Sequence, residues 1–128
     1  MNTEFWKNKK VFITGHTGFK GGWLSLWLSK MGAEVKGYSL LPDKPQSFFS
    51  STNLSSILDS QIGDIRDEKN LQKSLNLFKP EIVFHLAAQP LVRRSYQEPI
   101  ETFHTNIIGT SNLLNSLKDI DTLRAVVV

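Results

Sequence analysis

The sequence predicts an α/β protein built on a doubly wound parallel sheet. Short apolar segments alternate with amphipathic, helix-like segments from one end of the chain to the other. A glycine-rich turn joins the first of these strands to the first helix. The 128 residues, 40% of them hydrophobic, are enough for one domain with one core. We therefore expect one α/β domain.

The first strand and helix are predicted from the pattern on either side of the glycines. An apolar strand is expected at Lys10 to Thr14 and a helix at Phe19 to Met31, which Gly32 ends. The helix has apolar residues at the spacing i, i+3, i+4 and i+7: Leu24, Trp27, Leu28 and Met31.

The next unit repeats the strand-then-helix order after a longer connection. A second strand is expected at Glu34 to Leu40, followed by a polar, proline-rich loop up to Asn53. A short third strand at Gln61 to Asp64 leads into a helix at Glu68 to Phe78 that Pro80 follows. The helix carries Leu71, Leu75 and Phe78 on one face.

The remaining elements complete the pattern. Glu81 to Ala87 is a nearly continuous apolar run, typical of a parallel strand covered on both faces. A helix is expected at Ile100 to Leu117 and a fifth strand at Leu123 to Val128. Right-handed crossovers then predict the strand order 3-2-1-4-5. Because the sequence stops on a buried strand, we expect the sheet to be incomplete after the fifth strand.

Composition and charge exclude several classes of function. With no cysteine in the sequence, disulfides, thiolate catalysis and cysteine-based metal sites are excluded, and the three histidines are too scattered for a metal motif. The net charge of +3 is dispersed, which predicts a solvated surface and no nucleic-acid partner. Without an apolar run of about 18 residues or a secretory signal, we expect no membrane association and a cytoplasmic location.

The glycine turn carries the main functional signal. Gly15, Gly18 and Gly21 form the pattern G-x-x-G-x-x-G between a strand and a helix. Glycines there allow a tight turn, close approach of the backbone to a pyrophosphate and close packing of the helix, whose free N–H groups face the phosphates. Lys20 precedes Gly21 instead of a Ser or Thr, which argues against a mononucleotide P-loop. A dinucleotide site is the favoured interpretation, and a ligand-free turn is the alternative.

Five segments together resemble the extended short-chain dehydrogenase/reductase family, which contains nucleotide-sugar epimerases and dehydratases. They are Thr14 to Gly21, Gly63-Asp-Ile65, Phe84-His-Leu-Ala-Ala-Gln89, Pro99 and Thr105-Asn-x-x-Gly-Thr110. The resemblance covers essentially the whole chain and implies a Rossmann-like fold that binds NAD, with NADP not excluded. Residues 1–128 would be the N-terminal part of the dinucleotide-binding domain, and the substrate domain would lie outside them.

The resemblance also implies which residues meet the cofactor. The adenine would lie near Asp64, and small residues after strand 4 would pass the ribose and nicotinamide. The full set of expected cofactor residues is Gly15, His16, Thr17, Gly18, Phe19, Lys20, Gly21, Ser39, Asp64, Ile65, Leu86, Ala87, Ala88, Gln89 and Thr105. Asp64 taken alone is equally well a turn or helix-cap residue. His85 is interpreted as a hydrogen-bonded core histidine in preference to a catalyst.

The chain departs from the family pattern in two respects. Ser39 stands near the end of strand 2, where an acidic residue usually selects NAD and a basic one NADP. The family's catalytic Tyr-x-x-x-Lys pair is absent, because Pro42 and Ile100 stand four residues after the two tyrosines. We therefore expect no catalytic residue here. A nucleotide-sugar dehydratase, an epimerase and a non-catalytic dinucleotide-binding module remain open, with a nucleotide-sugar substrate and a homo-oligomer expected for the full-length enzyme.

Overall fold

A five-stranded parallel sheet forms the centre of the computed structural model, which describes residues 3–128. The strands are β1 (Lys10–Thr14), β2 (Glu34–Ser39), β3 (Asp59–Ile62), β4 (Ile82–His85) and β5 (Ala125–Val127). Their order is β3-β2-β1-β4-β5 and every pairing is parallel. The predicted doubly wound topology is confirmed.

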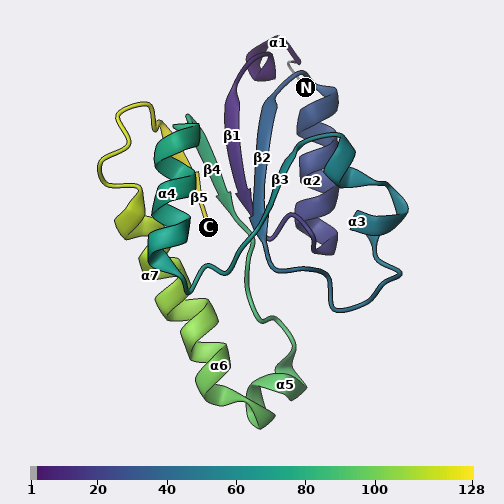
Figure 1. Ribbon diagram of the computed structural model, residues 1–128, viewed down its shortest axis with the longest axis vertical. Helices are drawn as coiled ribbons and strands as arrows, with labels where there is room; N and C mark the ends of the chain where they lie inside the picture. Colours follow the sequence, from purple (N-terminus) through teal and green to yellow (C-terminus); the bar gives the residue numbers. More distant parts are fainter. Residues whose placement is uncertain (1–2) are drawn as a thin grey trace.

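Helices cover both faces of the sheet (Figure 1). The α-helices are α1 (Thr3–Trp6), α2 (Phe19–Lys30), α3 (Phe48–Ser51), α4 (Glu68–Phe78), α5 (Val92–Gln97), α6 (Pro99–Phe103) and α7 (Gly109–Ser116). A 3₁₀ turn, η1, spans Leu54–Ser56, and a π-helical turn, η2, spans His104–Ile108. Figure 1 shows α2 on one side of the sheet and α4 with α7 on the other.

Alternation along β1 divides the core into two clusters. Phe12 packs toward α4 and α7 with Tyr38, Leu71 and Leu113, all buried. Val11 and Ile13 point the other way, toward α2. Because successive side chains of a strand alternate between faces, one strand contributes to both clusters.

The sheet-facing side of α2 differs from the predicted apolar stripe. Leu28 and Met31 are buried as expected, but Trp27 is half exposed. Gly21, Gly22 and Ser25 are buried instead. These small residues let the helix approach the β1 turn closely, which leaves no room for a bulky side chain there.

Two strands end two residues earlier than predicted, and β2 and β5 end one residue earlier. β3 ends at Ile62, so Asp64 lies in the loop beyond it, and β4 ends at His85. The N–H groups of Leu86 and Ala87 bond the Thr14 hydroxyl, at 3.1 and 3.2 Å, and the Leu86 N–H also bonds the Thr14 carbonyl oxygen, at 3.2 Å. Asp64 and residues 86–89, which are expected to meet a ligand, thus belong to loops at the carboxyl edge of the sheet, where doubly wound folds bind ligands.

Candidate functional site

A cavity of about 900 Å³ lies at the carboxyl edge of the sheet, around the ends of β1, β2 and β4. Fourteen of the fifteen expected cofactor residues line it, and only His16 does not. The lining residues foreseen from sequence are Gly15, Thr17, Gly18, Phe19, Lys20, Gly21, Ser39, Asp64, Ile65, Leu86, Ala87, Ala88, Gln89 and Thr105. Segments from five parts of the chain thus converge on one hollow.

The glycine turn is shaped by close backbone contacts. Gly15 has φ of +79°, and a Cβ there would lie 2.7 Å from the backbone of Leu86 and Ala87. A Cβ on Gly21 would lie 2.1 Å from the Gly15 carbonyl oxygen. At Gly18 a Cβ would meet only that oxygen, at 3.3 Å. Gly15 and Gly21 therefore build the turn, and Gly18 leaves space open above it.

The start of α2 suits an anionic group. No side chain caps this helix end, and its first turn has no acidic residue, while Lys20 lies on it at the cavity. The first N–H groups of a helix have no partner inside the helix, and its dipole is positive at this end. The pyrophosphate of a dinucleotide fits the chemistry of these donors and the open space at Gly18.

His16 turns its side chain away from the cavity. The ring is fully buried, its Nε2 lies 2.7 Å from Ser60 Oγ, and Nδ1 has no hydrogen-bond partner. It occupies the space that Gly37 leaves on β2, where a Cβ would lie 2.2 Å from His16 Cγ. Burial lowers the pKa of His16 to about 4. Its expected role as a cofactor ligand is thus not supported by side-chain geometry, and it anchors the turn to β2 and β3.

The end of β2 offers only neutral groups. Thr17 Oγ1 donates to the Leu40 carbonyl at 2.8 Å and lies 2.9 Å from Ser39 Oγ. Because the Thr17 proton is used on Leu40, Ser39 donates to Thr17 and keeps its own lone pairs as acceptors. Ser39 can therefore accept a hydrogen bond from a hydroxyl group in the cavity.

Asp64 belongs to a cluster of charges at the far wall. Arg66 donates hydrogen bonds to its carboxylate, with Nη2 2.6 Å from Oδ2. This hydrogen bonding lowers the pKa of Asp64. Glu101 of α6 lies between Arg66, at 3.9 Å, and Arg94, at 3.1 Å. Arg94 lines the cavity and ties α5 to α6.

The loop after β2 also lines the cavity, although the sequence did not predict this. Further residues complete the lining. They come from the segment after β2, from the loop after β3, and from the segment that leads into α5 and α6: Leu40, Leu41, Pro42, Asp43, Lys44, Gln46, Ser47, Phe48, Gly63, Pro90, Leu91, Arg94 and Glu101. The signal was available, because a loop that follows a parallel strand emerges at the ligand-binding edge.

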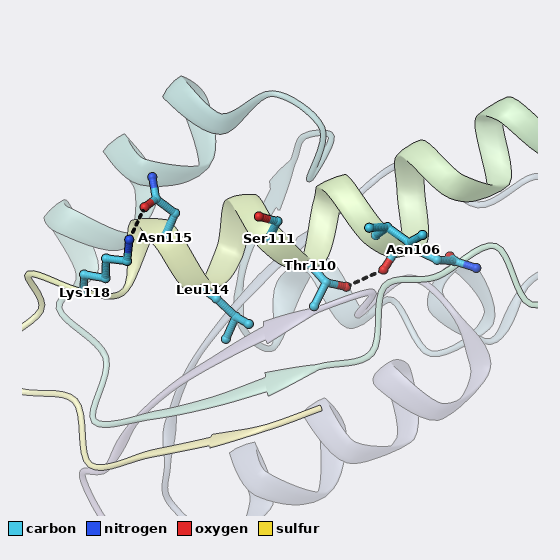
Figure 2. Close-up of a pocket in the computed structure, with 7 residues that line it drawn as sticks. Asn106, Thr110, Ser111, Leu114, Asn115 and Lys118 are labelled. Carbon is cyan, nitrogen blue, oxygen red and sulfur yellow. Dashed lines mark hydrogen bonds between the residues drawn. The ribbon is translucent and has the colours of Figure 1, made fainter.

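A second hollow, of about 500 Å³, lies on the outer side of the π turn and α7 (Figure 2). Several of its polar groups already have hydrogen-bond partners: Lys118 Nζ lies 2.8 Å from Asn115 Oδ1, Thr110 Oγ1 lies 2.7 Å from the Asn106 carbonyl oxygen, and the Asn106 amide bonds the backbone of Gln89. Its apolar members, Ile107 and Leu114, are half exposed. This surface lacks the converging polar groups of a ligand site.

Neither tyrosine of the chain lines the cavity. Tyr38 is fully buried, and burial raises its pKa to about 12, which makes it unsuited to proton transfer. In this part of the chain no three acidic or histidine side chains gather as metal ligands. Nor is any helix between residues 3 and 128 long and apolar enough to cross a bilayer.

Comparison with known proteins gives consistent matches. The family model described as GDP-mannose 4,6 dehydratase matches residues 12–127. The chain is 55% identical over 127 residues to the CDP-glucose 4,6-dehydratase of Salmonella typhimurium, covering 99% of this chain and 35% of that protein. It is 32% identical to the GDP-mannose 4,6-dehydratase of Vibrio cholerae, covering 87% of this chain and 32% of that protein.

Solved structures agree with the fold. The UDP-glucose 4-epimerase of Brucella ovis in complex with NAD superposes with a TM-score of 0.78 at 26% identity, over 91% of this chain and 34% of that one. The Thermus thermophilus UDP-glucose 4-epimerase complex with NAD superposes with a TM-score of 0.78 at 27% sequence identity. The match covers 90% of this chain and 35% of that one. The chain spans about a third of the length of the relatives it matches.

Proposed function

We propose, on the premise that this chain belongs to the GDP-mannose 4,6-dehydratase family, that it is the NAD-binding part of a nucleotide-sugar 4,6-dehydratase. The substrate of the complete enzyme is CDP-glucose in this proposal. The observation that carries the proposal is the convergence of the glycine turn, Ser39, Asp64 and the loop after β4 on one cavity. The 55% identity to a CDP-glucose 4,6-dehydratase favours that substrate. In this view residues 1–128 form the first part of the dinucleotide-binding domain, and the substrate domain lies elsewhere in the protein.

Each part of the cavity would hold a different part of the dinucleotide. The N–H groups at the start of α2 would bind the pyrophosphate, with Lys20 adding a positive charge. Ser39 would accept a hydrogen bond from a ribose hydroxyl. Asp64 and Ile65 would flank the adenine. Leu86 to Gln89 and Thr105 would line the nicotinamide end, where Ala87 and Ala88 leave room for the ring.

When bound, NAD would supply the reversible acceptance of a hydride that a 4,6-dehydration of the sugar requires. The residues described above bind and orient the dinucleotide for that chemistry. Tyr38 does not line the cavity and is buried with a raised pKa, so we expect other residues of the complete protein to move the protons. We expect the complete enzyme to be cytoplasmic and a homo-oligomer.

Turnover of CDP-glucose labelled with deuterium at C4 tests this function in the full-length protein. A 4,6-dehydratase releases one water and moves the label to C6 of the same sugar. An inverted sugar that keeps its label at C4 would instead establish an epimerase. Tight NAD binding without turnover of CDP-glucose, GDP-mannose or UDP-glucose would establish a non-catalytic dinucleotide-binding module.

Ser39→Asp is expected to sharpen the choice between NAD and NADP. A carboxylate at this position would make a charged hydrogen bond to the ribose, which tightens NAD by about 1 kcal/mol. It would also repel a 2′-phosphate and weaken NADP. Calorimetry with both dinucleotides measures the ratio of dissociation constants, and the isosteric, neutral Ser39→Asn is the matched control. Equal ratios for Asp and Asn would show that residue 39 does not meet the ribose.

A further inference from the structure

Three buried or half-buried side chains form a continuous hydrogen-bond chain beside the cavity. Thr14 Oγ1, at the end of β1, lies 2.7 Å from His85 Nδ1, and His85 Nε2 lies 2.8 Å from Thr110 Oγ1 on α7. Thr110 Oγ1 in turn lies 2.7 Å from the carbonyl oxygen of Asn106, as Figure 2 shows. These hydrogen bonds thus link β1, β4 and α7 to the π turn η2.

The direction of each hydrogen bond follows from the donors at the two ends. Thr14 Oγ1 already accepts from the N–H groups of Leu86 and Ala87, so its own proton must be donated to His85 Nδ1. Thr110 donates to the Asn106 carbonyl, so its oxygen must accept from His85 Nε2. The two ends independently require the same state: a neutral His85 with its proton on Nε2.

The surroundings of His85 favour that neutral form. The side chain is buried, with 6% of its surface exposed. Burial lowers the pKa of His85, and no charged neighbour contributes to this shift. The imidazole therefore stays neutral near pH 7 and bonds at both nitrogens.

Both ends of this hydrogen-bond network reach residues that line the cavity. At one end Thr14 holds the N–H groups of Leu86 and Ala87. At the other end the π turn places Thr105 on the cavity wall. From the same turn the Asn106 amide clamps the backbone of Gln89, accepting from its N–H at 2.8 Å and donating to its carbonyl at 3.1 Å. The loop 86–89 is thus held at its start and at its end by one network.

We propose that His85 is a positioning residue for the dinucleotide site. Its single tautomer fixes the distance between the loop 86–89 and the π turn, so that both walls of the nicotinamide end are set together. This role rests on the proposed function for its ligand. The hydrogen-bond assignment itself does not depend on any ligand.

Two substitutions at Thr110 separate the hydroxyl from the shape of the side chain. Thr110→Val keeps the shape and removes the hydroxyl, whereas Thr110→Ser keeps the hydroxyl. In the full-length protein we expect the valine variant to speed hydrogen exchange at the Gln89 amide and to weaken NAD binding by roughly 3- to 10-fold, the effect of one lost hydrogen bond. The serine variant should stay within about 2-fold of the original affinity.

Nitrogen chemical shifts of His85 provide a test that needs no variant. With ¹⁵N-labelled histidine, we expect the shifts of a neutral ring protonated on Nε2 near pH 7. A ring protonated on Nδ1, or equal Gln89 exchange in the valine and serine variants, would overturn the proposal. Failure of the unmodified protein to bind any dinucleotide would refute the proposed function, while the shifts and the exchange rates would still decide the hydrogen-bond network.

Discussion

Replacing Gly18 by valine is expected to abolish dinucleotide binding while the protein stays folded. Gly18 has φ of −76° and ψ of 171°, extended values that valine adopts readily. A Cβ would have only one near protein neighbour, the Gly15 carbonyl oxygen at 3.3 Å. The rest of the valine side chain would extend into the space at the start of α2 where a pyrophosphate would bind. We expect affinity for NAD to fall by at least about 100-fold.

Calorimetry with NAD, together with thermal unfolding of the full-length variant, checks this result. Gly18→Ala is the matched control and should bind NAD more tightly than the valine variant, because it adds a single Cβ near the Gly15 carbonyl oxygen and no branched methyl groups. Gly21→Ala should instead lower the stability of the fold by several kcal/mol, because its Cβ would lie 2.1 Å from a backbone oxygen. Unchanged NAD affinity in a folded Gly18→Val protein would place the phosphates elsewhere.

Acid is expected to destabilise the protein through His16 by up to about 3 kcal/mol. The pKa of His16 is about 4 in the fold, against 6.5 for an ordinary histidine. Between these values the unfolded chain binds a proton that the folded protein does not, so stability falls as pH falls. The contribution is fully present above pH 6.5 and is lost progressively toward pH 4. The physical cause is the burial of the ring, which disfavours its charged form.

Urea unfolding at about pH 7.5 and about pH 5 measures this slope. His16→Gln is the comparison, because an amide cannot titrate in this range but can still bond Ser60. The glutamine variant should lose less stability than the original protein between the two pH values. If both proteins lose the same free energy, the His16 ring is not held neutral by the fold.

The sequence by itself was sufficient to predict the sheet order and most of the cavity wall. The sheet order depends on a local pattern, apolar strands alternating with helices, and the glycine turn on three glycines where a strand meets a helix. The other wall residues were expected from the resemblance to the extended short-chain dehydrogenase/reductase family. Such patterns transfer directly to the fold, because parallel strands with short connections allow few topologies. The edge where the strands end then follows, and with it the placement of Gly15, Ser39 and Leu86 around one hollow.

The tertiary structure alone decided which of these side chains face the cavity. His16 stands between two lining residues in the sequence, yet its ring is drawn into the space above Gly37, which lies 21 positions away. The π turn at His104–Ile108 has no local sequence signal, and it turns Thr105 to the cavity and Asn106 to Gln89. These orientations depend on contacts between residues far apart in the chain, and such contacts exist only once the strands and helices have packed.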